Sequence, residues 1–213
     1  MMAEINERLN LPDNIEVIRD QISAIIFSEM KNQYALAVAD DDPVADDYLT
    51  TVLVENDEPL QAGGDNDLFP IVNISVDNVR RDGGASVNTS NRVASLNLDC
   101  YQVGNTSGKF AGRTAIIKAW KLARCIRAIL ESDQYTYLFL RGIVNKVRIN
   151  SMTGGYPSGM ENSAVKVAVV RLTVEVTYDQ NSPQTTGPGL TILPVVISDE
   201  NGQVVGNIKE EYS

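Results

Sequence analysis

Few residues of this chain could do chemistry, and the most suggestive group is a glycine-rich turn that ends in a lysine. Gly104-Asn-Thr-Ser-Gly108-Lys109 lies between a strand-like segment and a helix-like segment, where backbone N–H groups can hold a phosphate. The spacing does not fit, because the first glycine of a phosphate-binding loop would fall at Val103. Phe110 also stands where a Ser or Thr would hold Mg²⁺, so we expect a turn that leads into a helix.

A second candidate is a group of acidic residues that could bind a divalent cation. It comprises Asp40, Asp41, Asp42, Asp46 and Asp47. The group lacks the alternating Asp/Asn ligands, the central glycine and the closing Glu of an EF-hand. We therefore predict no metal site, and we interpret the group either as a solvated loop or as a surface that meets cations of a partner.

The rest of the composition argues against catalysis. The chain has no histidine, which removes the commonest general base and the commonest metal ligand. Cys100 and Cys125 lack the spacing of a metal or redox motif, and we expect both to be buried in a reducing cytoplasm. The sequence thus predicts a protein that is not an enzyme and binds no cofactor.

The most distinctive segment is a basic helix at residues 109–127. Its six cations, with no acid among them, are Lys109, Arg113, Lys118, Lys121, Arg124 and Arg127. At 100° per residue the apolar positions fall on one arc: Ile116, Ala119, Leu122, Ala123, Ile126, Ile129 and Leu130. The cationic side could contact an acidic surface of another subunit, face DNA or line a channel, or simply be solvated.

The charge of the chain is divided along its length. The net charge is −10, yet residues 1–68 hold 16 acids against 3 bases and residues 69–213 hold 12 acids against 15 bases. Such a division predicts contact between charged surfaces, either in copies of this chain or with a partner. The acidic residues 40–47 and the basic helix are the expected subunit interface.

The pattern along the chain predicts an α+β fold, with a mostly antiparallel sheet of long hairpins packed against two helices. The first helix begins at a capping box of Asp13 and Glu16 and ends near Leu36. An acidic excursion follows at 40–69, in which residues 48–54 could form a short edge strand. Strands are expected at 71–77, 93–101, 135–149 and 165–178, from their alternating apolar residues.

Two long segments leave alternatives open. The last two strands, joined by a flexible glycine-containing loop at 151–162, form either a hairpin that projects to a neighbouring subunit or a bent strand that follows its own sheet. After a single domain at 1–180, residues 181–213 read as a linker and an extended C-terminal arm, which either adds an edge strand or pairs with another chain.

The order of elements from Ile15 to Tyr178 resembles that of the tail terminator (tail completion) proteins of tailed bacteriophages. The resemblance implies a structural protein of the virion neck that forms a homohexameric ring at the head-proximal end of the tail. The implied partners are copies of itself, the tail tube protein and the head connector or stopper, with DNA passing through the lumen. The alternatives are another neck protein, such as a stopper or adaptor, and a nucleic-acid- or ligand-binding module.

The compartment follows from what the sequence lacks. The N-terminal MMAEINERLN is acidic and polar, so we expect no signal peptide. No apolar run approaches the ~20 residues of a membrane span. We therefore expect a soluble protein, made in the host cytoplasm and located in the virion, that has no membrane partner.

Overall fold

The computed structural model describes residues 13–57, 69–82, 91–104, 111–157 and 166–180, and the backbone of residues 196–198 and 204–207. The chain divides into two compact units, Asn10–Asn181 and the pair of terminal segments Met1–Leu9 and Ser182–Ser213. In the second unit, β6 (Val196–Ser198) pairs antiparallel with β7 (Val204–Asn207). The rest of the predicted linker and C-terminal arm lies outside the described residues.

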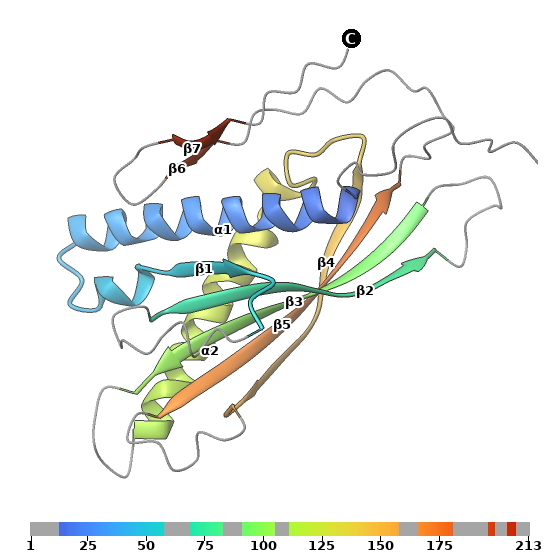
Figure 1. Cartoon of the computed structure of the whole chain (residues 1–213). Helices are drawn as coiled ribbons and strands as arrows, with labels where there is room; N and C mark the ends of the chain where they lie inside the picture. Colours follow the sequence, from blue (N-terminus) through green and yellow to red (C-terminus); the bar gives the residue numbers. More distant parts are fainter. Residues whose placement is uncertain are drawn as a thin grey trace, which may run out of the picture. The chain divides into compact units, whose positions relative to one another are not determined.

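The first unit has the predicted α+β class, with two helices and a five-stranded sheet (Figure 1). Its elements in order are α1 (Asn14–Ala39), η1 (Ala45–Tyr48), β1 (Thr51–Val54), β2 (Ile71–Arg81), β3 (Asn91–Val103), α2 (Ala111–Leu130), η3 (Asp133–Tyr135), β4 (Val144–Gly155) and β5 (Val167–Asp179). The predicted capping box is confirmed, because Asp13 accepts from the N–H of Ile15 and Glu16 accepts from the N–H of Asp13.

The strands lie in the order β1-β2-β3-β5-β4. All neighbours are antiparallel except β1, which runs parallel to β2. The expected edge strand within residues 48–54 is therefore confirmed as β1, but its direction was not predicted. A parallel pair needs a long connection, and residues 55–70 provide it.

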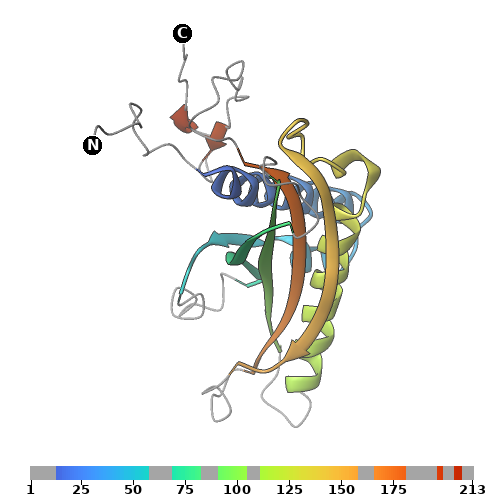
Figure 2. The same cartoon turned by 90° about the vertical axis from the view of Figure 1, so that its right-hand side faces the viewer.

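The sheet has two unlike faces. The face that we call the covered face carries Ile74, Leu98 and Leu172, which belong to one hydrophobic cluster with residues of α1 and α2. The opposite face, which we call the polar face, carries Asp99 and Arg171, and none of the described helices packs on it. Figure 2 shows α2 along the covered face of the curved sheet.

The predicted third strand at 135–149 is wrong for its first nine residues. Tyr135 ends η3, and residues 136–143 form turns with positive φ at Leu138 and Phe139, which an extended strand does not allow. Leu138 is fully buried, so the apolar run anchors a compact loop instead of a strand. Strand β4 then continues to Gly155, through the first part of the predicted flexible loop.

The described part of the long hairpin follows its own domain. Ile149 and Met152 of β4 pack against the core, and the hydroxyl of Tyr156 donates to the carbonyl of Gly112 at the start of α2. Gly154 lies so close to Trp120 that an added Cβ would be 2.9 Å from the indole nitrogen. These contacts favour the bent-strand interpretation for residues 144–157.

Candidate functional site

Helix α2 presents a buried side to the sheet and a cationic side away from it. The buried side is the predicted arc, except that Ile116 is half-buried and Ala111 and Ala115 complete the contact. The alanines permit α2 to lie close to β3 and β5, since they have small side chains. The cations and the exposed Ile117 therefore remain on the outer side.

Two of the predicted interface cations are paired within the chain. Lys118 Nζ lies 2.9 Å from one carboxylate oxygen of Asp47, and Lys121 Nζ lies 3.7 Å from the other. Lys121 also lies 4.8 Å from the centre of the Tyr48 ring. The side chain of Asp47 is only 15% exposed, so these contacts hold η1 against α2. The acidic and basic segments thus meet here inside one subunit.

The other cations of α2 point to solvent. Arg127 pairs with Glu131 at 2.9 Å, one turn along the helix. Arg124 donates from Nε to the carbonyl of Trp120, and neither Arg124 nor Arg113 forms an ion pair with a residue that the structure describes. The remaining predicted cation, Lys109, lies outside the described residues.

The acidic residues 40–47 form the turn between α1 and η1. Asp40 is the C-cap of α1, Asp41 has a φ of 53°, and the Asp42 carboxylate accepts from the N–H of Val44. Asp40, Asp41 and Asp46 form no ion pair with any described residue. No group of acidic or cysteine side chains in the described part of the chain could hold a metal ion.

The acidic turn also exposes apolar side chains. We call residues 36–49 the acidic corner, because these unpaired carboxylates lie among four exposed apolar side chains. They are Leu36, Val38, Val44 and Leu49, the last of which is 58% exposed. Backbone hydrogen bonds from Asp40 to Leu36 and from Asp42 to Ala37 fold this segment on the end of the helix.

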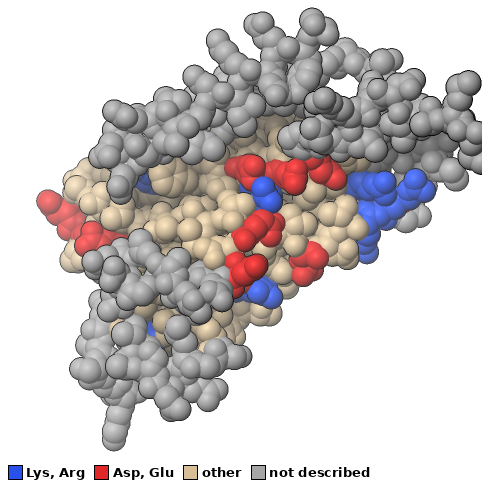
Figure 3. All heavy atoms as spheres, in the orientation of Figure 1, with Lys and Arg blue, Asp and Glu red and all other residues tan. Residues whose placement is uncertain are grey.

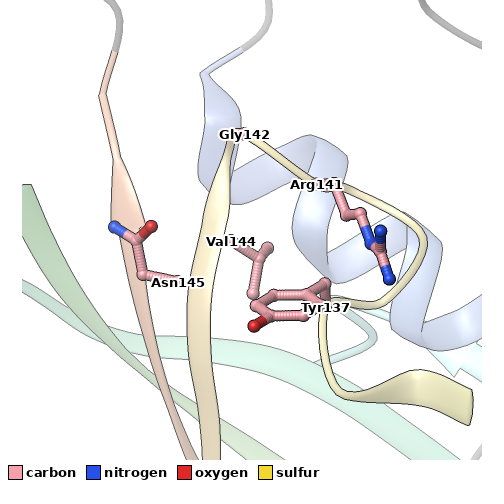
Figure 4. Close-up of a pocket in the computed structure, with 5 residues that line it drawn as sticks. All are labelled: Tyr137, Arg141, Gly142, Val144 and Asn145. Carbon is pink, nitrogen blue, oxygen red and sulfur yellow. The ribbon is translucent and has the colours of Figure 1, made fainter.

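Sequence reasoning missed a second surface, the loop of residues 136–142, which we call the aromatic loop. Tyr137 and Phe139 are 39% and 54% exposed, and the Arg141 guanidinium lies 5.6 Å from the centre of the Tyr137 ring. Tyr137, Arg141 and Val144 line a hollow of 360 Å³ (Figure 4). The segment Tyr-Leu-Phe-Leu-Arg at 137–141 is the sequence signal for this surface, but such an apolar run is equally typical of a strand.

A polar cluster on the polar face was also missed, because it depends on strand register. Asp99 and Arg171 are directly opposite on β3 and β5, and Arg171 donates to both carboxylate oxygens at 2.7 Å. The bond to Asp99 raises the pKa of Arg171. Burial, followed by the negative charge of Asp99, raises the pKa of Tyr101 to about 12. This cluster holds the carboxylate of Asp99 and the guanidinium of Arg171 together on the sheet.

A second hollow, of 250 Å³, lies between α1 and α2 and includes Glu29, Cys125 and Tyr135. The Tyr135 hydroxyl donates to Glu29, and burial with this bond raises the pKa of Tyr135 to about 12. Burial also raises the pKa of the Cys125 thiol, so the thiolate that a nucleophile needs is disfavoured.

The glycine-rich turn has a structural explanation at its first residue. The N–H of Gly104 donates to the carbonyl of Lys166, and an added Cβ would lie 2.0 Å from the carbonyl oxygen of Ala111. Gly104 is therefore required by the close approach of β3 to the start of α2. Residues 105–110 lie outside the described part.

The comparisons with known proteins add no identification. No protein-family model matches the chain, and no curated protein gives a significant match. Neither described helix is long and apolar enough to cross a membrane.

Proposed function

We propose that this protein is a structural subunit that assembles with copies of itself into a ring at the head-proximal end of a bacteriophage tail. The ring ends polymerisation of the tail tube and provides the surface to which the head connector docks. It contains no active site. The virion role rests on the resemblance in element order, and self-assembly rests on the surface of the subunit.

One observation carries the self-assembly. Two sets of exposed charges, of opposite sign, have no ion-pair partner among the described residues. The basic set is Arg113 and Arg124 on α2, and the acidic set is Asp40, Asp41 and Asp46 at the acidic corner. Both sets lie beside exposed apolar side chains, including Ile117, which is 55% exposed. A second copy of the chain supplies the complementary charge to each set.

Other charges, apart from these two sets, are also unevenly distributed on the surface seen in Figure 3. Figure 3 shows acidic side chains across the middle of this view and a basic group at its right-hand edge, over the paired ends of β2 and β3. Strand β2 ends in Arg80 and Arg81, and β3 begins with Asn91 and Arg92. Head-to-tail contact between unlike surfaces produces rings when the rotation closes.

The test is the mass of the purified protein by light scattering over a range of concentration. We expect six times the chain mass of 23.3 kDa at low salt. Each exposed ion pair contributes ~0–1 kcal/mol, and the Debye length falls from ~10 Å at 0.1 M salt to ~3 Å at 1 M, so high salt should weaken the assembly. A monomer with salt-sensitive DNA binding would contradict the proposal and favour a nucleic-acid-binding module.

A double charge reversal on α2 measures how much this helix contributes to the assembly. Arg113→Glu with Arg124→Glu should leave the circular dichroism spectrum unchanged and shift the protein toward monomers. The control is Lys146→Glu with Arg148→Glu, two exposed cations of β4 whose reversal changes the net charge equally. Equal loss of assembly in both variants would show a general charge effect and remove α2 from the interface.

A further inference from the structure

The aromatic loop is held in one conformation before any partner binds. Its anchors are Tyr135, which bonds Glu29, and Leu138, which is fully buried. Backbone N–H groups of Leu138 and Leu140 donate within the turn, at 2.9 and 2.7 Å. Phe139 packs its ring edge-to-face on Tyr135, with 5.3 Å between ring centres. Because the loop is already ordered, binding need not order it again.

The backbone of the aromatic loop is strained at two residues. Leu138 and Phe139 have φ of 50° and 59°, a region that bulky residues rarely adopt. The burial of Leu138 compensates for this strain, and Tyr137 and Phe139 on either side of it remain partly exposed, with Arg141 over the Tyr137 ring. Tyr and Arg are enriched among the residues that dominate protein–protein binding energy.

The charge of this surface defines the complementary partner. Arg141 stacks over Tyr137 and forms no ion pair with any residue that the structure describes, so its N–H groups can donate to a carboxylate of a partner. The adjacent hollow, which Tyr137, Arg141 and Val144 help to line, has a volume of 360 Å³ and so has room for an apolar side chain (Figure 4). The partner should therefore present carboxylates beside exposed aliphatic groups.

The acidic corner has this chemistry, and it lies in another part of the same unit. Tyr135 bonds Glu29 near the middle of α1, and Asp179 links Ile143 to Asn14 at the first residue of α1. The bonds therefore fix the residues on either side of the aromatic loop beside α1 between Asn14 and Glu29, whereas the corner begins at the end of the helix, Ala39. At a rise of 1.5 Å per residue, Ala39 lies about 15 Å from Glu29 and about 38 Å from Asn14, so the contact must be made between copies.

We propose that the aromatic loop of one copy docks on the acidic corner of the next copy. Tyr137 and Phe139 pack on aliphatic side chains such as Val44 and Leu49, and Arg141 pairs with a carboxylate of the turn. The contact is head-to-tail, so it leaves each copy with a free loop and a free corner until the ring closes. This inference rests on the proposed self-assembly and specifies which surface of the neighbouring copy meets the acidic corner, separately from the contribution of α2.

The first measurement is the concentration at which the assembly dissociates. Tyr137→Ala with Phe139→Ala should raise it about 30-fold or more, the effect of removing an aromatic anchor. Unchanged thermal unfolding would establish that the variant is folded. Arg141→Glu should also weaken assembly, and adding Asp46→Arg should restore part of it, because the two reversals recreate an opposite-charge contact.

The second measurement is crosslinking between copies in a Cys125→Ser background, where the remaining Cys100 is fully buried. The variant Val44→Cys with Phe139→Cys should form covalent multimers under an oxidant or a short bis-maleimide. The control replaces Val79 instead of Phe139, because Val79 is exposed to the same 42% as Val44 but lies on β2. It should remain uncrosslinked.

The outcomes separate this inference from the proposed function. Covalent multimers from Val44→Cys/Phe139→Cys alone support the loop–corner contact. If the ring forms normally but both cysteine variants crosslink equally poorly, the loop–corner contact is overturned and the proposed function stands. The same holds if Tyr137→Ala/Phe139→Ala leaves the assembly unaffected. A wild-type protein that stays monomeric overturns the proposed function and this inference with it.

Discussion

Along β5, the side chains on the covered face are buried without exception from Ala168 to Tyr178, whereas those between them on the polar face are exposed or half-buried. The covered face is stabilised by burial of apolar area, which does not depend on direction. The polar face is stabilised by specific pairs such as Arg171 with Asp99, which depend on register and on geometry. Substitutions on adjacent residues of one strand can therefore separate the two kinds of stabilisation.

The largest expected effect is on the covered face. Leu172→Ala should lower the free energy of unfolding by about 2–5 kcal/mol, because it leaves a cavity at a fully buried position. The control is the next residue, Thr173→Ala, on the polar face, which should cost less than about 1 kcal/mol. Urea unfolding followed by circular dichroism measures both, and equal losses would contradict the distinction between the faces.

An intermediate and asymmetric effect is expected for the ion pair of the polar face. The Asp99 side chain is 8% exposed and that of Arg171 is 50% exposed. Arg171→Ala should cost about 2 kcal/mol, because it leaves a buried carboxylate without its main partner, whereas Asp99→Ala should cost about 1 kcal/mol, because the arginine is rehydrated. The same unfolding experiment tests the order, and a larger loss for Asp99→Ala would show that burial does not control the cost.

The smallest effect concerns two successive glycines of β4. A Cβ at Gly154 would lie 2.9 Å from Trp120 on the covered side, whereas a Cβ at Gly155 would meet nothing within 4 Å. We expect Gly154→Ala to cost about 1 kcal/mol and Gly155→Ala to be within about 0.5 kcal/mol of wild type. Trp120 is the only tryptophan, so its fluorescence should shift for Gly154→Ala alone. A shift of equal size for both would contradict the close contact.

The surfaces proposed for assembly differ in whether the sequence reveals them. The acidic corner and the cations of α2 were found from composition, since charge is read directly from the residues. The aromatic loop was not found, because its run of apolar residues is equally compatible with a strand. Only the positive φ of Leu138 and Phe139 and the burial of Leu138 separate the two interpretations.

The sequence by itself determined the parts that depend on neighbours along the chain. The capping box at Asp13, the buried arc of α2 and the alternation of β3 and β5 follow from local periodicity, because a helix repeats every 3.6 residues and a strand every 2. They sufficed for the α+β class and for the side of each element that is buried.

Only the tertiary structure decided which distant residues meet. Asp47 pairs with Lys118, 71 positions away, and Asp99 pairs with Arg171, 72 positions away. It also decided that β1 runs parallel to β2. The physical reason is that register and ion pairing depend on how separate elements pack together, and one-dimensional periodicity carries no information about that packing.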